Sequence, residues 1–330
     1  MLKIDTMKKC TALLFSTLLA WSVHAQNHPT YDSLVQEAWQ LYENKSFLAS
    51  GQTYAQAFTS RGNLGEVNDR YNAACSWALA GVEDSAFVQL FRIAERGNYA
   101  NYNHLTTDVD LKSLYADDRW DEVVALVEKN KERVEANYDK PLVAMLDTIY
   151  REDQKYRLQM DSVQKKYGFE SEEMRELIQT MNEKDSANLV AIETVLEDRG
   201  WLGADVIGPQ GNMTLFLVIQ HADQETQEKY LPMMREAAKE GKARPADLAL
   251  LEDRVALGQG KKQIYGSQIG VDSTGQHFVR PLEDPLTVDE RRAAVGLPPL
   301  AEYASYFGIT WDAEAYAQQL PDIEKKEKNL

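Results

Sequence analysis

Apolar residues recur at helical spacing along the second half of the chain. Between Leu142 and Val163 they return every three or four residues, except that Asp153 takes one position of this stripe. A second stripe of the same kind, with Asp185 in its gap, runs from Met174 to Leu196. Ser171 precedes the second stripe as a good N-cap, with two glutamates in the first turn. The segment 213–222 is apolar nearly all round, which is typical of a central helix. The pattern therefore predicts two long amphipathic helices packed beside one buried helix.

The remainder of that half alternates helices with a single β signal. Gly and Pro predict a loop over 206–212, and helical spacing returns over 224–239 and 245–257. Strand-like runs then flank the turn residues 272–275, which predicts a β-hairpin over 263–280. The fold class that we expect is mainly α: a short helical array followed by a helical domain with one β-hairpin.

The first half of the chain contains an internal repeat. Small, aromatic and small residues recur 37 residues apart, so that Ala38, Tyr54 and Ala57 match Cys75, Phe91 and Ala94. This pattern resembles the tetratricopeptide repeat, a helical pair of about 34 residues with small residues where the helices touch. The three extra residues fit the loop 61–65. Arrays of this kind generally hold a peptide in a concave groove, so the resemblance implies a protein or peptide partner.

The N-terminus has the parts of a secretory signal peptide. A basic segment over 7–9 is followed by a mostly apolar run over 10–23 and by small residues that allow cleavage after Ala25. The run is shorter than the ~20 residues that a spanning helix needs, which favours cleavage over a membrane anchor. We therefore expect residues 1–25 to be removed, leaving a periplasmic or secreted protein with no membrane span.

Three segments then make up the mature chain. A tetratricopeptide-like array is expected over 27–137, and an uncharacterised helical domain with the hairpin over 141–320. The acidic, lysine-containing residues 321–330 predict a flexible tail. Residues 108–137 resemble a further half-repeat. Because two and a half repeats are near the minimum for a stable array, we expect the first segment to depend on the second.

Acidic residues outnumber basic ones. The sequence has 52 Asp and Glu against 36 Lys and Arg, which gives a net charge of −16. Binding to nucleic acid or to anionic lipid needs Lys and Arg concentrated on one face, so this balance argues against both. Cys75 is the one cysteine left after cleavage, which excludes an intramolecular disulfide and favours a packing role between the repeat helices.

Polar motifs are dispersed through the second half of the chain, from about residue 142 to 308. They are Asp153-Gln154, Asp185 with Asn188, Gly200-Trp201, Gln220-His221-Ala222-Asp223 with Gln227, Asp253-Arg254, Gln263-Ile264-Tyr265-Gly266-Ser267-Gln268, Asp289-Glu290-Arg291-Arg292 and Gly296-Leu297. Together they resemble a bacterial family known only as a domain of unknown function. The family brings no established activity, substrate or cofactor, so the resemblance implies a domain boundary and leaves the function open.

His221 is the sharpest candidate for catalysis. It closes the predicted central helix beside Asp223, and an imidazole titrates near neutral pH, which suits general acid–base work. A carboxylate such as Asp253, Asp185 or Asp153 would fix its tautomer, and Asp223 or Asp253 is the orienting partner in the enzyme hypothesis. The alternative is structural, because the dipole of a helix favours a cation at its C-terminus and buried polar groups can form a satisfied network.

Polar residues on the inward-facing stripes are candidates for ligand binding. Asp153 and Arg157 are four residues apart on the first long helix, and Asp185 lies in the gap of the second stripe. The ligand-binding candidates are Asp153, Arg157, Asp185, Gln220, Arg254, Tyr265 and Gln268. No histidine spacing demands a metal, and the motifs of nucleophilic serine enzymes are missing, so we expect neither a metal nor a cofactor.

Two functions remain open from the sequence. The leading hypothesis is an exported binding or scaffold protein of the cell envelope, whose repeats engage a protein or peptide. The alternative is an envelope hydrolase or small-ligand-binding domain that uses His221 and nearby carboxylates. Convergence of Asp153, Asp185, His221, Asp253 and Gln268 on an open cleft would favour the alternative.

Overall fold

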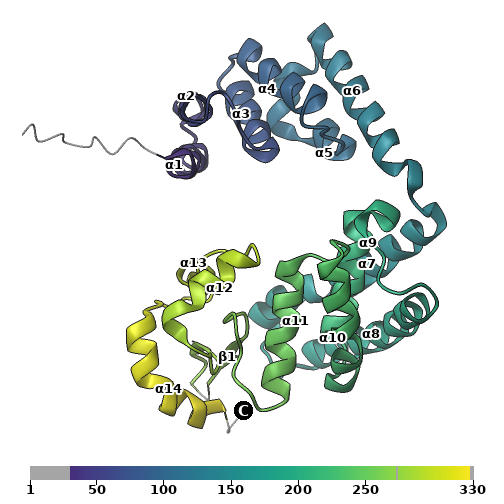
Figure 1. The fold of residues 1–330 in the computed structure, drawn as a ribbon, viewed down its shortest axis with the longest axis vertical. Helices are drawn as coiled ribbons and strands as arrows, with labels where there is room; N and C mark the ends of the chain where they lie inside the picture. The colour runs from purple at the N-terminus through teal and green to yellow at the C-terminus, as the bar shows by residue number, and fades with distance from the viewer. Residues whose placement is uncertain (1–29, 273, 328–330) are drawn as a thin grey trace, which may run out of the picture. The chain divides into compact units, whose positions relative to one another are not determined.

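The computed structural model describes residues 30–272 and 274–327, so the predicted signal peptide over 1–25 lies outside the described residues. The contacts within the chain divide it into two compact units, the first ending at Asn130 and the second beginning at Lys131. The described residues form mainly helices, with one two-stranded antiparallel sheet (Figure 1). The expected fold class, mainly α with one β-hairpin, is confirmed.

The N-terminal unit is an array of short helices. Its elements are α1 (Tyr31–Glu43), α2 (Phe47–Ser60), α3 (Val67–Leu79), α4 (Glu83–Glu95), α5 (Tyr102–Thr107), the 3-10 helix η1 (Val109–Leu114) and most of α6 (Asp118–Val134), whose last turn belongs to the second unit. α1 pairs with α2, and α3 pairs with α4. The first residues of the two pairs are 36 positions apart, from 31 to 67 and from 47 to 83, where the sequence match predicts 37.

Small residues let the helices of this array approach closely. Ala38, Ala57 and Cys75 are buried in its apolar core. A Cβ atom on Gly51 in α2 would lie 2.6 Å from the ring of Trp77 in α3, so only glycine fits there without a shift. The predicted packing role of Cys75 agrees with this burial.

The C-terminal unit is a helical bundle followed by a smaller α/β segment. Its elements are η2 (Glu135–Asn137), α7 (Lys140–Tyr167), α8 (Glu172–Arg199), α9 (Ala204–His221), α10 (Gln224–Lys239), α11 (Pro245–Gly258), β1 (Ile269–Val271), β2 (His277–Val279), η3 (Pro285–Thr287), α12 (Val288–Ala294), α13 (Leu300–Ser305) and α14 (Ala313–Glu327). The two long helices fall where the stripes predict them, and Ser171 caps α8 by accepting the backbone N–H of Met174. α7 packs against α8 and α9 around one apolar core.

The predicted loop over 206–212 is wrong, because most of these residues are helical. Gly208 has a φ of +71° and breaks the chain direction, and Pro209 then begins the long part of α9. Gly211 lies inside this helix, and a Cβ atom at that position would be only 3.0 Å from Leu146 of α7, so glycine suits this close contact. Residues that usually mark a loop are used here to bring α9 close to α7.

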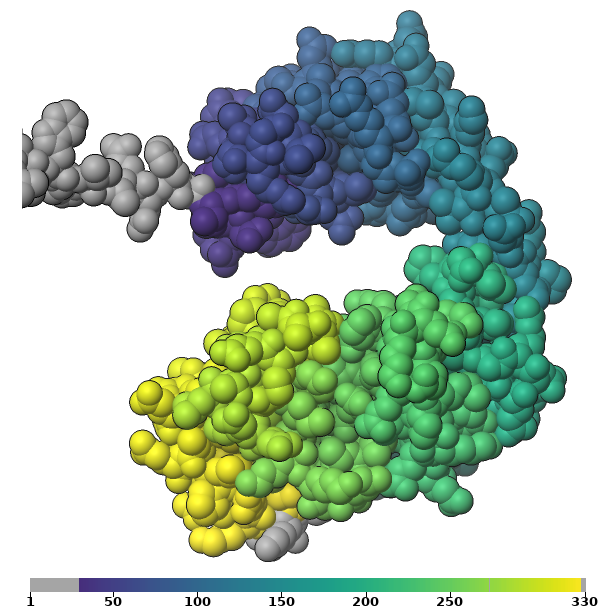
Figure 2. Space-filling model, in the orientation of Figure 1, coloured from purple at the N-terminus to yellow at the C-terminus, as the bar shows by residue number. Residues whose placement is uncertain are grey.

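The hairpin is present, but its first strand is shorter than predicted. β1 and β2 pair antiparallel, with Ile269 opposite Val279, while Gln263 forms an isolated bridge with Leu282. The predicted flexible tail is wrong as far as Glu327, since Ile323 of α14 is buried in the second apolar core of this unit. Figure 2 shows this last segment, in yellow, forming a continuous surface with the green residues before it.

Candidate functional site

His221 lies at the turn between α9 and α10. Ala222 is extended, and Asp223 caps α10 by accepting the backbone N–H of Thr226 at 2.8 Å. On the other side of the site, Nδ1 of His221 is 2.9 Å from Oδ1 of Asp153 on α7. The exposed fractions of the two side chains are 16% and 1%. The turn therefore holds the imidazole against a buried carboxylate.

Asp153 is kept ionised by the groups around it. Gln154 donates Nε2–H to its Oδ2 at 2.7 Å, and a guanidinium nitrogen of Arg157 lies 3.4 Å from its Oδ1. Burial opposes ionisation, but the hydrogen bond with His221 and the charges of His221 and Arg157 outweigh burial and lower the pKa of Asp153. Because an ionised carboxylate only accepts hydrogen bonds, Nδ1 of His221 is the donor and Nε2 is left for a ligand.

Arg157 connects this pair to α8. Its two terminal nitrogens donate to the two carboxylate oxygens of Asp185 at 2.9 and 2.7 Å. One of them also donates to the backbone carbonyl of Asp153 at 2.6 Å. A bidentate arginine–carboxylate pair fixes both groups in orientation, so Asp185, Arg157, Asp153 and His221 form one network across three helices.

A cavity of about 270 Å³ opens at this network. Its lining comes from α7, α8, α9 and the turn after α9: Asp153, Asn182, Asp185, Ser186, Leu189, Val218, His221, Ala222 and Asp223. Six of the nine lining side chains are polar, and Leu189, Val218 and Ala222 supply apolar surface. A histidine oriented by a carboxylate at the edge of such a cavity can give or take a proton from a bound molecule.

The expected role of Asp253 as the partner of His221 is wrong. Asp253 is fully buried, and its carboxylate accepts the backbone N–H groups of Ile264, Tyr265 and Ser267 at 2.6–2.9 Å. Burial raises the pKa of Asp253, which the three backbone donors only partly offset. This carboxylate holds the loop before the hairpin, which is why β1 begins later than the sequence predicts.

Tyr265 and Gln268 belong to that loop and do not line the His221 cavity. The backbone carbonyl of Tyr265 accepts from Arg292 at 2.7 Å, and the side chain of Gln268 donates to Ser267 at 3.0 Å. Their hydrogen bonds organise the loop around Asp253. Of the predicted ligand-binding residues, Asp153 and Asp185 line the cavity, whereas Tyr265 and Gln268 stabilise the loop.

The remaining candidates are placed differently. Asp223 lines the cavity, but it caps α10 and makes no hydrogen bond to His221, so its predicted orienting role is also wrong. Gln220 and Arg254 do not line the cavity. Oε1 of Gln220 and Nε of Arg254 are buried without a hydrogen-bond partner among the described residues.

Two lining residues escaped the sequence analysis. Asn182 and Ser186 lie three residues before and one residue after Asp185 on α8, and Leu189 follows on the same face. This spacing of three and four residues was a usable signal, since it places all four side chains on one side of the helix. The apolar stripe did not select Asn182 and Ser186 because both side chains are polar.

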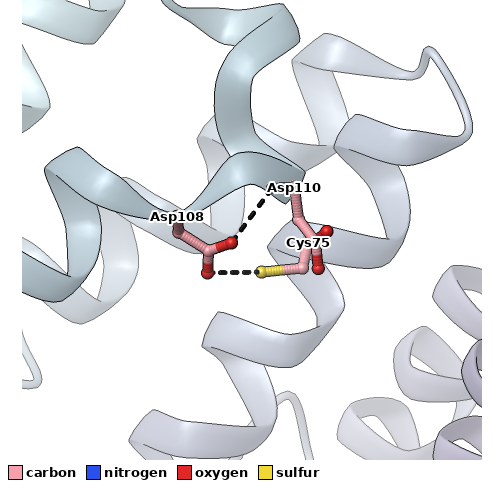
Figure 3. A group of neighbouring side chains, drawn as sticks. All are labelled: Cys75, Asp108 and Asp110. Atoms are coloured by element: carbon pink, nitrogen blue, oxygen red, sulfur yellow. Dashed lines mark hydrogen bonds between the residues drawn. The ribbon is translucent and has the colours of Figure 1, made fainter.

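A second cluster lies in the N-terminal unit (Figure 3). Cys75 of α3 donates to the carboxylate of Asp108 at 3.7 Å, and the other oxygen of Asp108 accepts the backbone N–H of Asp110 at 3.0 Å. It is the one group of three such side chains in the described residues whose ligand atoms are close enough to share a metal ion. Tyr71 donates to Asp108 and Tyr42 to Asp110. Burial and the two carboxylates raise the pKa of Cys75, so the group is a hydrogen-bonded network around a protonated thiol.

The fold and the site define a mainly helical protein with a histidine–aspartate pair at a small cavity. A family of unknown function, DUF6624, matches residues 138–316, which is more than half of the chain, and the protein belongs to this family. No curated protein and no solved structure matches the chain. No helix in the described part of the chain is both long and apolar enough to cross a membrane.

Proposed function

We propose that the C-terminal unit binds a small polar ligand in the His221 cavity and that His221 acts on it as a general acid–base. The observation that supports this proposal is the contact between Nδ1 of His221 and the ionised Asp153, at the edge of a cavity of about 270 Å³. Histidine–carboxylate pairs of this kind hold the imidazole of hydrolases in one tautomer. We therefore favour hydrolysis of an envelope component, with an exported protein as its setting.

Each residue of the network has a distinct task in this proposal. Nε2 of His221 takes a proton from a bound water and then gives it to the leaving group. Asp153 stabilises the imidazolium that forms between the two steps. Arg157 and Asp185 keep Asp153 in place through their bidentate contact.

A comparison of two histidine variants tests the proposal. The purified chain is incubated with a panel of esters, amides and glycosides prepared from bacterial envelopes, and the products are followed by mass spectrometry. We expect His221→Gln to lose at least about a hundredfold of the turnover, and His277→Gln, at an exposed histidine of β2, to keep it. Equal turnover by His221→Gln and the unaltered chain would contradict the proposal.

A second function is proposed for the N-terminal unit, as a tetratricopeptide-like module that binds a peptide. The observation that favours it is a hollow of about 410 Å³ along α1 and α3, where Trp39 is 45% exposed. We expect Trp39→Ala to lose a partner cross-linked from a periplasmic extract, and Val109→Ala, at another exposed apolar side chain of this unit, to keep it. Retention of the partner by Trp39→Ala would contradict this function.

A further inference from the structure

The wall of the His221 cavity carries more negative than positive charge. Asp153, Asp185 and Asp223 line it, and none of the described residues that line it is a lysine or an arginine. Arg157 bonds to Asp185 and lies close to Asp153, so it balances one charge of that pair. Even with His221 in its charged form, the wall keeps a net negative charge.

Asp223 is a solvent-exposed carboxylate, and it is the one on this wall that has no cationic side chain paired with it among the described residues. Its donor is the backbone N–H of Thr226 at 2.8 Å, and no described lysine or arginine forms an ion pair with it. The hydrogen bonds with Thr226 lower the pKa of Asp223, so the group is ionised at neutral pH. Leu189 and Val218 supply apolar surface within the same cavity. A ligand with a cationic end and an aliphatic body matches both features.

Beside the cavity, residues of α8 alone line a shallow depression of the surface. It shares Asn182 and Ser186 with the cavity and includes Arg175 and Glu183. The His221 cavity alone, at about 270 Å³, is slightly smaller than the ~300–1,000 Å³ of most small-molecule sites. A molecule longer than the cavity would therefore extend onto the exposed surface of α8.

We infer that the His221 cavity binds the ammonium end of an extended alkyl chain, with the ammonium against Asp223 and the methylene groups on Leu189 and Val218. The inference rests on the proposed function, since it names the ligand class of the same site. A lysine side chain of a peptide and a free diamine share this chemistry; the first carries amide bonds that hydrolysis can cleave, and the second would bind as a product.

Three probes of equal chain length test the charge. Pentylamine, pentanol and pentanoate are titrated into the purified chain at neutral pH by calorimetry. We expect pentylamine to bind, and Asp223→Asn to weaken its binding by about two- to fivefold, because the carboxylate is exposed and solvent screens its pairing with an ammonium. Asparagine also caps helices well, so this variant keeps the start of α10. Asp161→Asn changes an exposed carboxylate of α7 outside the cavity and should leave the affinity unchanged.

The outcomes separate this inference from the proposed function. Binding of pentanol or pentanoate at least as tight as that of pentylamine would overturn the cationic class while leaving the histidine proposal intact. An absence of binding by all three probes, or equal binding of pentylamine by Asp223→Asn, would also overturn it. If pentylamine binds, cadaverine and Nα-acetyl-lysine amide are compared next, and the tighter of the two identifies a free diamine or a lysine side chain.

Discussion

Two buried carboxylates of the C-terminal unit have opposite surroundings. Asp153 is bound by the side chains of His221, Gln154 and Arg157 beside a cavity, whereas Asp253 is bound by the backbone N–H groups of one loop. The pKa of Asp153 is lowered and that of Asp253 is raised. Burial is therefore a poor marker of a functional site. The titratable partner and the neighbouring cavity distinguish the Asp153 site from the Asp253 loop.

The largest effect is expected from Asp253→Ala. It leaves the N–H groups of Ile264, Tyr265 and Ser267 without their acceptor, which costs about 3 kcal/mol or more. In a unit of this size, that lowers the melting temperature by roughly 6–12 °C. Calorimetric melting of the purified chain measures it, and Asp253→Asn should cost less because it keeps an acceptor. A loss below about 1 kcal/mol would mean that Asp253 does not hold the loop.

An intermediate effect is expected from Asp153→Asn. The change removes the charge opposite His221 and Arg157, but Arg157 keeps its bidentate bond to Asp185. The free energy of unfolding should fall by about 1–3 kcal/mol, which is measured by urea titration. Asp161→Asn on the same helix is the matched control and should leave the stability unchanged. A larger loss for Asp153→Asn than for Asp253→Ala would reverse the comparison.

The two carboxylates also predict opposite responses to acid. Because its pKa is lower in the folded state, Asp153 contributes stability that is present above the ordinary aspartate pKa of about 3.9 and is lost as the pH falls below it. Because the pKa of Asp253 is higher in the folded state, ionisation of this carboxyl destabilises the fold. As the pH falls toward about 3.9 the folded chain protonates Asp253, and this destabilisation is lost.

Unfolding free energies of three chains across this pH range measure the difference. As the pH falls below about 3.9, Asp153→Asn should lose less stability than the unaltered chain. As the pH falls toward about 3.9 from above, the unaltered chain should gain stability from protonation of Asp253, and Asp253→Asn should not. Parallel profiles for the two variants would contradict the assignment of the two environments.

Periodicity predicted most helices of the C-terminal unit and failed where a side chain acts on a distant backbone. The stripes placed α7 and α8 correctly because apolar residues recur at helical spacing in both segments, although full burial in α7 ends at Asp153 and in α8 passes from Met174 directly to Asn188. The first strand was predicted too long because Asp253, on another element, binds the backbone of residues 264–267. The start of α9 was missed because Gly208 and Pro209 serve there as a kink and a helix start.

The site was predictable in its members but not in its pairing. The stripes indicated that Asp153 and Asp185 face inward, and the end of the apolar helix indicated His221. The sequence did not distinguish which inward-facing carboxylate contacts His221, because that contact depends on how α7 and α9 pack. The sequence therefore favoured Asp223 or Asp253 in the enzyme hypothesis, and the structure brings Asp153 to the histidine.

The smallest stability effect is expected from His221→Gln, and it separates the two kinds of site most directly. The glutamine amide can still donate to Asp153, and the native side chain is already 16% exposed, so the loss should stay below about 1 kcal/mol. Glutamine does not titrate, so proton transfer at the cavity should be lost while the fold is kept. Melting of His221→Gln beside His277→Gln measures the stability. A fall of about 3 kcal/mol in the free energy of unfolding for His221→Gln, but not for His277→Gln, would mean that His221 and Asp153 stabilise the fold, as Asp253 does.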